Sequence, residues 1–343
     1  MYKDRFIKRT FDLGTASIAF LAAFAIQLIF QVIVLAIGLS GAATTWTIVV
    51  GNQIILFGAS IFFCFYHRVD PIAITGLKRP PKWYFFPIYV LIAIFCVTAF
   101  APIAGVISKL LTMLGYEYEP TYHIPLDNPG LFALAFLGLT LLPVLGEEMM
   151  VRGVLLSGAK EKSPLFAIFF SALIFALMHG NFRQLTHQFL LGAVMGYLAY
   201  LTGGIYASAV VHIVNNGIAL LVEYGRANGW VNRAVYWYLS GKLGAEATLI
   251  GVSVSIFAIA MLLVLVTVLT HQDRSLDEEY IPRDGKLFAR VTAYLTFLST
   301  PKEEREKETA ERPERPNRYS VIMAIILVAA LVTVVCLSIV SGT

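Results

Sequence analysis

The chain has 343 residues, of which 58% are hydrophobic and only 14% are charged, and its mean hydropathy is +0.74. This composition lies outside the range of soluble globular proteins and indicates a polytopic membrane protein. The formal net charge is +4, and no basic cluster is interleaved with aromatic residues. The sequence therefore gives no basis for nucleic-acid binding.

Apolar segments recur along the chain, and we expect an all-α bundle of about nine transmembrane helices. The first segment runs from Leu13 to Leu39. It is longer than the apolar part of a cleaved signal peptide, so we expect it to be retained as a helix. The other segments cover 46–66, 84–113, 131–159, 164–180, 187–201, 204–222, 246–270 and 319–341. Most reach the ~17 to 25 residues that a membrane span requires, and 187–201 is short.

Basic residues are distributed unevenly among the loops between these segments. Lys and Arg are frequent in residues 1–10 and in the 67–82 loop, whereas the 114–130 loop contains neither. Because short cytoplasmic loops carry an excess of Lys and Arg, this pattern predicts a cytoplasmic N-terminus. The protein is therefore expected to be an integral, multi-pass membrane protein.

The predicted helices divide the chain into five parts. Residues 1–128 hold the first three helices, and residues 129–225 form a core that carries unusual polar groups. Residues 226–270 form an outer loop and the eighth helix, residues 271–318 a linker, and residues 319–343 the last helix. The linker includes the run KEEREKETAERPERPNR, which is too polar to fold alone, so we expect a charged cytoplasmic linker.

Three ionisable residues, Glu147, Glu148 and Arg152, lie in the apolar 131–159 segment. Each charge at bilayer depth costs about 3 kcal/mol on the mildest insertion scale, so the group requires an explanation. Glu148 and Arg152 are four residues apart and can pair along one helix face, where they would lock the helix. Glu147 is rotated from them by about 100° and is left without a partner.

Two later segments carry polar groups of the same kind. His179 closes the run Phe175-Ala-Leu-Met-His179, and His212 is followed one turn later by Asn216. With a rise of ~1.5 Å per residue, these groups and Glu147 all lie near the middle of a ~30 Å hydrocarbon core. We choose Asn216 over the adjacent Asn215 because only Asn216 shares a helix face with His212.

A carboxylate, two imidazoles and an amide in one lipid-shielded cavity suit acid–base hydrolysis. The carboxylate and one imidazole would deprotonate a water molecule, and hydrogen-bond donors would stabilise the oxyanion. We assign Glu147 as the base and Glu148 as a structural anion. No similar group of polar residues accompanies His123 or His187. We expect His123 in a loop and His187 at a helix end.

The motifs Glu147-Glu148-x-x-x-Arg152-Gly153, Phe175-x-x-x-His179 and His212-x-x-x-Asn216 follow one another on successive helices. In this order they resemble the motifs of the CAAX-protease and bacteriocin-processing (CPBP) family. That family of intramembrane proteases includes CAAX prenyl protease 2 and the lysostaphin-resistance-protein-A-like proteins. The resemblance covers roughly residues 129–224.

The resemblance implies that Glu147 and His179 activate water, that His212 and Asn216 polarise the scissile carbonyl, and that Glu148 and Arg152 support the site. Members have been regarded both as glutamate proteases and as metalloproteases. On the second view Glu147, His179 and His212 would bind zinc, and on the first no cofactor is required. The residue types suit zinc, but no HExxH motif is present, so both alternatives stay open.

We therefore expect an intramembrane endopeptidase that acts on membrane-associated proteins or peptides within the lipid bilayer. The resemblance also implies a prokaryotic cell membrane. Two other functions fit the same residues. The carboxylates and imidazoles could form the relay of a proton- or ion-coupled transporter, or the chain could be a noncatalytic family member that acts as a scaffold or immunity factor.

Overall fold

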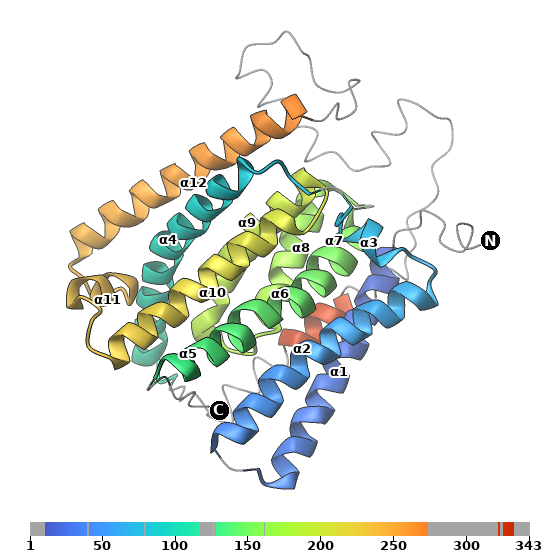
Figure 1. Ribbon diagram of the computed structural model, residues 1–343, viewed down its shortest axis with the longest axis horizontal. Coiled ribbons are helices and arrows are strands. Elements are labelled where there is room, and N and C mark those ends of the chain that lie inside the picture. The colour runs from blue at the N-terminus through green and yellow to red at the C-terminus, as the bar shows by residue number, and fades with distance from the viewer. Residues whose placement is uncertain are drawn as a thin grey trace.

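The computed structural model describes residues 11–39, 41–78, 80–116, 126, 128–160, 162–273, 322 and 325–332. These residues contain helices and no strand (Figure 1), so the all-α prediction is confirmed for them. The elements are α1 (Leu13–Ile37), α2 (Gly41–Tyr66), α3 (Pro71–Ile74), α4 (Phe85–Met113), α5 (Pro129–Phe136), η1 (Leu137–Leu141), α6 (Leu142–Glu147), η2 (Glu148–Leu155), α7 (Leu156–Ala159), α8 (Pro164–Leu177), α9 (Phe182–Thr202), α10 (Tyr206–Ala227), α11 (Arg233–Leu239) and α12 (Ala245–Asp273).

Six helices of the described part are long and apolar enough to cross a membrane. They are α1, α2, α4, the continuous helix from Pro129 to Ala159, α10, and α12 as far as Thr270. Helix α8 is apolar as well, but its 14 residues are fewer than a span requires. The chain is thus a polytopic helical membrane protein. The count of nine helices and the cytoplasmic N-terminus remain predictions.

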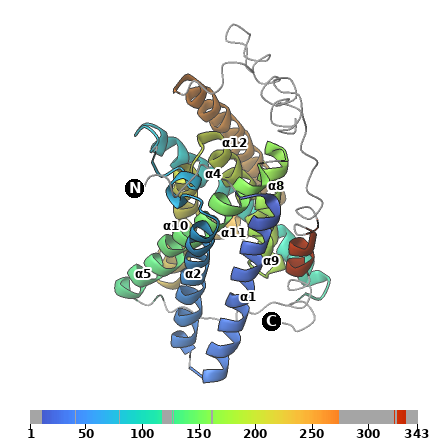
Figure 2. The same ribbon diagram turned by 90° about the vertical axis from the view of Figure 1, so that its right-hand side faces the viewer.

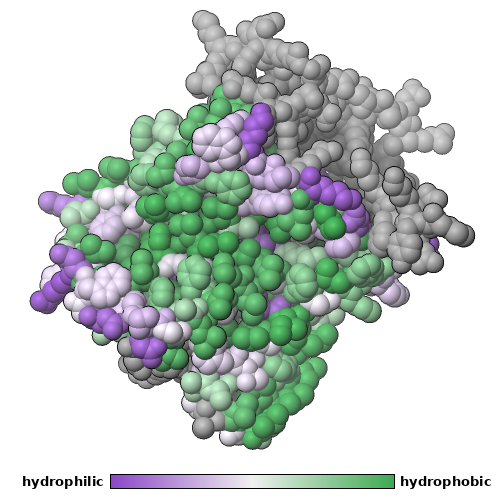
Figure 3. Space-filling view, viewed as in Figure 1, coloured by the Kyte–Doolittle hydropathy of each residue, from purple (hydrophilic) through white to green (hydrophobic). Residues whose placement is uncertain are grey.

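The outer surface is apolar over a wide area. Figure 3 shows a broad hydrophobic zone across one face, with hydrophilic residues toward its edges. Large side chains in this surface are well exposed, for example Val32 at 66%, Ile54 at 62% and Phe257 at 65%. Such a surface would drive association in water, whereas lipid acyl chains can cover it.

The helix that carries the Glu-Glu-Arg stretch is irregular in its winding. It runs without a break from Pro129 to Ala159, but η1 and η2 are π-helical turns within it. A π turn bonds residue i to residue i+5, and such turns are frequent at functional sites. Pro143 is the second residue of α6, which follows η1 directly. Proline lacks an N–H group, so it cannot donate to the carbonyl of Leu139 as a regular α-helix would require.

The η2 segment lies at the centre of the molecule, and all eight of its residues are buried. Two glycines flank it where other helices approach closely. A Cβ atom on Gly146 would lie 2.8 Å from the backbone oxygen of Gln53 on α2, and one on Gly158 would lie 2.6 Å from that of Asp12, which caps α1. Any larger residue would push α1 or α2 away.

Two groups of helices enclose this central segment. Helices α1 and α2 pack against each other and against it, and both views show their far ends projecting beyond the other helices (Figures 1 and 2). On the other side, α9 packs against α4, α8 and α10. The cavity described below lies between these two groups, because residues of both line it.

Several predicted boundaries are wrong. The 164–180 segment ends its helix at Leu177, because the chain turns through Gly180, whose φ of +63° favours glycine. The 187–201 segment begins earlier, at Phe182, where Asn181 caps α9. The predicted outer loop contains the short helix α11.

Other predictions lie largely outside the described residues. The 271–318 linker is described only to Asp273, where α12 ends, and the last helix only at 322 and 325–332, which are helical. Residues 1–10 and His123 are not described. The proposed division of the chain into five parts remains a prediction.

Candidate active site

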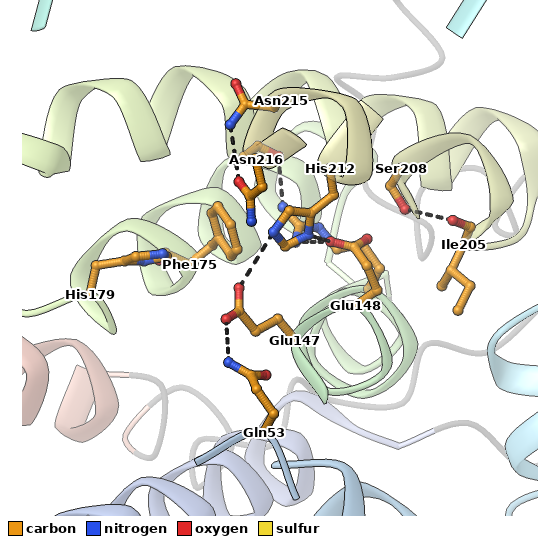
Figure 4. Close-up of polar contacts among 12 residues, drawn as sticks. Gln53, Glu147, Glu148, Phe175, His179, Ile205, Ser208, His212, Asn215 and Asn216 are labelled. Carbon is orange, nitrogen blue, oxygen red and sulfur yellow. Dashed lines mark hydrogen bonds and ion pairs between the residues drawn. The ribbon is translucent and has the colours of Figure 1, made fainter. Parts of the chain in front are cut away.

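The predicted polar residues converge from several elements on the central helix (Figure 4). Glu147 ends α6, and Glu148 and Arg152 lie in η2. His179 follows the C-terminal end of α8, and His212 and Asn216 lie on α10. Residues far apart in the sequence therefore meet at one place.

Glu148 and Arg152 form a buried ion pair. Arg152 donates from Nη1 to Glu148 Oε1 over 2.7 Å, and both side chains are fully buried. The Arg152 guanidinium also lies 4.4 Å from the centre of the Phe175 ring, and its Nη2 is 3.5 Å from the backbone oxygen of Gly192. A buried guanidinium requires such partners, because removing its carboxylate would leave an uncompensated charge.

Glu148 has a second contact, with His212. The Nδ1 atom of His212 lies 2.9 Å from Glu148 Oε1. An ionised carboxylate can only accept, so Nδ1 carries the proton and the ring is held in a fixed orientation. The Phe175 ring meets the imidazole edge-on at 5.7 Å. Glu148 therefore orients His212 as well as pairing with Arg152, which the i,i+4 spacing alone did not suggest.

Glu147 points away from this pair, toward α2 and α10. Gln53 on α2 donates from Nε2 to Glu147 Oε1 over 2.8 Å. The other carboxylate oxygen, Oε2, faces His212 Nε2 at 3.7 Å. Gln53 is a site residue that the sequence motifs missed. The available signal was the polar pair Asn52-Gln53 within an otherwise apolar helix.

His179 is oriented by its own helix. Its Nδ1 atom lies 2.7 Å from the backbone oxygen of Phe175, one turn earlier. Because a carbonyl accepts, Nδ1 carries the proton in the neutral ring, and Nε2 keeps its lone pair. His179 can therefore act as a hydrogen-bond acceptor or base through Nε2.

Asn216 is held on both sides of its amide. Its Nδ2 donates to the backbone oxygen of Leu139 over 3.1 Å, and its Oδ1 accepts from Asn215 over 3.2 Å. Asn215 is buried and contacts His187 at 3.1 Å. The expectation that His187 sits at a helix end is wrong, because it lies within α9 and faces α10.

A cavity of about 420 Å³ joins three of the predicted catalytic residues, Glu147, His179 and Asn216. Gln53 also lines it, and apolar side chains from α1 and α2 form much of the remaining wall. A water molecule occupies about 30 Å³ and needs two to four polar partners, so the polar end of this cavity can hold water. His212 lies beside the cavity and reaches Glu147.

The predicted zinc ligands do not form a metal site in this geometry. Among the residues described, no group of three His, Cys, Asp or Glu side chains is arranged to hold a metal ion. Nδ1 of His212 is bonded to Glu148, and Nδ1 of His179 to a backbone carbonyl. Each histidine thus keeps Nε2 free, the nitrogen that a metal-bound histidine with a bonded Nδ1 would use. The metalloprotease alternative gains no support from this geometry, and the choice between zinc and no cofactor remains a prediction.

Part of the chain matches a protein-family model. Residues 129–218 match the model described as type II CAAX prenyl endopeptidase Rce1-like. This segment is therefore similar to the CAAX protease family. It contains all three motifs, so the resemblance based on their residues is confirmed. Searches of curated proteins and of solved structures returned no match to this chain.

The family and the apolar helices together support an intramembrane protease of the CAAX type in a lipid bilayer. Gln53 lies outside the matched segment, on a helix that nevertheless contacts Glu147. The candidate site of the matched segment thus includes a residue from the N-terminal helices of the chain.

Proposed function

We propose that the protein hydrolyses peptide bonds of membrane-associated proteins or peptides, with Glu147 as the base that activates water. One observation carries this proposal. The carboxylate of Glu147 shares a cavity with His179 and Asn216, and its Oε2 faces His212 at 3.7 Å. A base, a second acceptor and amide and imidazole donors are the groups that hydrolysis by water needs.

Water would be activated between Glu147 and His179. Gln53 occupies Oε1 of Glu147, which leaves Oε2 to take the proton. His179 would accept the second hydrogen bond of the same water through Nε2, because its Nδ1 is already bonded to Phe175. The hydroxide equivalent then attacks the scissile carbonyl carbon.

Asn216 and His212 would stabilise the oxyanion that forms. Only one N–H of Asn216 is used by Leu139, so the second can donate to the oxyanion. His212 already donates from Nδ1 to Glu148, so it must receive a proton at Nε2 before it can donate there. Glu147, 3.7 Å away, can pass on the proton taken from water. The leaving amine finally receives that proton.

The proposal can be tested with purified protein in liposomes and a farnesylated CAAX peptide that carries a fluorophore and a quencher across the scissile bond. A pool of membrane-anchored peptides analysed by mass spectrometry extends the test to other substrates. Loss of a general base or its partner typically costs 10²–10⁴-fold, so Glu147→Ala and His179→Ala should lower kcat/KM by about 10³.

Glu223 provides a matched control, because it is an exposed glutamate on α10 that pairs with Arg226. Glu223→Ala should cleave like the wild type. Cleavage by folded Glu147→Ala at the wild-type rate would overturn the proposal. Flux of a solute without any peptide product would indicate the transporter, and neither activity would indicate a noncatalytic protein.

The glutamate mechanism also predicts the effect of metal removal. Dialysis against EDTA should leave cleavage unchanged, because no step of this mechanism passes through a metal. Loss of activity that added Zn²⁺ restores would contradict the metal-free mechanism.

A further inference from the structure

A row of hydrogen bonds connects α9 to the candidate site through two amide side chains. His187 Nε2 lies 3.1 Å from Asn215 Oδ1, Asn215 Nδ2 lies 3.2 Å from Asn216 Oδ1, and Asn216 Nδ2 lies 3.1 Å from the Leu139 backbone oxygen. We call these residues the His187–Asn215–Asn216 chain. Figure 4 shows its inner part, with the Asn215 amide directed at Asn216 above Glu147.

At the inner end of the His187–Asn215–Asn216 chain, the direction of the hydrogen bond is fixed. The Leu139 oxygen is a backbone carbonyl and can only accept a hydrogen bond. In a regular α-helix its donor would be the N–H of residue 143, but this residue is Pro143. Asn216 replaces that donor, so its Nδ2 must face Leu139.

The direction of this bond determines the direction of the two hydrogen bonds further out in the His187–Asn215–Asn216 chain. With Nδ2 facing Leu139, Asn216 presents Oδ1 to Asn215, which must answer with its own Nδ2. Asn215 then presents Oδ1 to His187, so His187 must carry a proton on Nε2. The Leu139 carbonyl thus sets, through two amide side chains, the direction in which His187 Nε2 donates.

We propose that His187 is a positioning residue, which fixes Asn215 and through it holds the amide of Asn216 in the orientation that hydrolysis needs. This inference rests on the proposed oxyanion role of Asn216. An amide that turned over would present its oxygen to the oxyanion in place of an N–H group, and catalysis depends on donors fixed before the reaction.

The side chains of Asn215 and His187 are packed against protein, which favours a positioning role over solvation by water. Asn215 is 4% exposed, and His187 packs edge-on against the Phe100 ring of α4 at 6.4 Å. His187 does not line the cavity, so it acts on the reaction only through Asn215 and Asn216.

A double-mutant cycle tests this coupling with the reconstituted full-length protein and the farnesylated reporter peptide. His187→Leu removes the donor, and we expect kcat to fall about tenfold with KM unchanged within twofold. His187→Gln supplies an N–H donor and should stay within threefold of the wild type. In the Asn216→Ala background, His187→Leu should change kcat less than twofold, because the residue it positions is gone.

Equal losses from His187→Leu in both backgrounds, or equal losses in His187→Gln and His187→Leu, would overturn the proposal, since packing alone would explain them. A second measurement does not depend on activity. In protein labelled with ¹⁵N-histidine, NMR should show His187 protonated on Nε2, and Asn215→Ala should shift that signal. If Nε2 of His187 is unprotonated, or if its signal does not shift in Asn215→Ala, the proposed His187–Asn215–Asn216 chain is refuted.

These outcomes are separable from failure of the proposed function. If wild type and Glu147→Ala both lack cleavage, the proposed function fails and the positioning role falls with it. If wild type cleaves and Glu147→Ala does not, the proposed function stands whatever His187→Leu does.

Discussion

The family-matched segment 129–218 and the pair formed by α1 and α2 contribute different chemistry to one cavity. The matched segment supplies the ionisable groups Glu147, His179 and His212 together with the buried pair that holds them. The α1–α2 pair supplies uncharged amides, among them Gln53, and much of the apolar wall. The ionisable groups of the cavity thus come from the matched segment, whose η2 part is fully buried, and not from α1 or α2.

This difference follows from the cost of charge in a membrane. A charge at bilayer depth needs a partner and burial, and η2 is buried on every side. The far ends of α1 and α2 are exposed, and in a bilayer an uncharged amide costs less there than an ion. We infer that the matched segment carries the reaction and that α1 and α2 orient the base and shape the substrate cavity. The following substitutions test this division, beginning with the largest effect.

Arg152→Met should damage the fold itself. It leaves Glu148 buried without its cation, and breaking a buried pair from one side typically costs about 3–5 kcal/mol. Thermal unfolding in detergent should show a large fall in Tm and little folded protein. The double variant Glu148→Gln with Arg152→Met should recover part of that loss. An unchanged Tm for Arg152→Met would show that the pair does not hold the central helix.

Gln53→Leu should lower activity and leave the fold intact. A hydrogen bond to a charged group contributes about 1.5–3 kcal/mol, so loss of this contact with Glu147 should reduce kcat/KM by roughly 10- to 100-fold. Gln31 lines the same cavity from α1, and Gln31→Leu is the matched control. Equal, small effects of both changes in the cleavage assay would remove Gln53 from the site.

Pro143→Ala should move stability and activity in opposite directions. An alanine N–H can bond the Leu139 carbonyl, which supplies a helix hydrogen bond that proline cannot make. Asn216 would then share its acceptor with that N–H group, which weakens its hold on the amide, and we expect kcat to fall about fivefold while Tm rises. Pro164→Ala, at the start of α8, should change neither quantity much. A lower Tm with unchanged kcat would contradict this account of the proline.

The smallest effect concerns the cavity wall. Val49→Trp narrows the part of the cavity formed by α2, and it should raise KM a few-fold for the farnesylated peptide with little change in kcat. Val32, 66% exposed on α1, provides the control Val32→Trp, which should leave KM unchanged. A reduced kcat in Val49→Trp would place α2 in the chemical step instead.

The sequence predicted the parts of this site that have a regular spacing. The four-residue intervals from Glu148 to Arg152 and from His212 to Asn216 place each pair along one helix, and the depth estimate brought Glu147, His179 and Asn216 to one level. The structure places these three around one cavity. Their catalytic roles remain predictions.

The sequence could not predict contacts between helices that carry no motif. Gln53 lies 94 residues from Glu147, and His187 lies 28 residues from Asn215. Neither contact follows from periodicity, because each depends on how neighbouring helices rotate against each other. The π turns were not foreseeable either. They alter the register of the central helix, and no propensity of Glu148 or its neighbours signals them.

Single-turnover cleavage in H₂¹⁸O, by the wild type and by Glu147→Gln, tests the central claim most directly. Glutamine keeps the shape of Glu147 but cannot accept the proton of water. We predict that wild-type product carries one ¹⁸O atom in its new C-terminal carboxyl group, and that Glu147→Gln forms product about 10³-fold more slowly. Product formed by Glu147→Gln at the wild-type rate would contradict the assignment of Glu147 as the base.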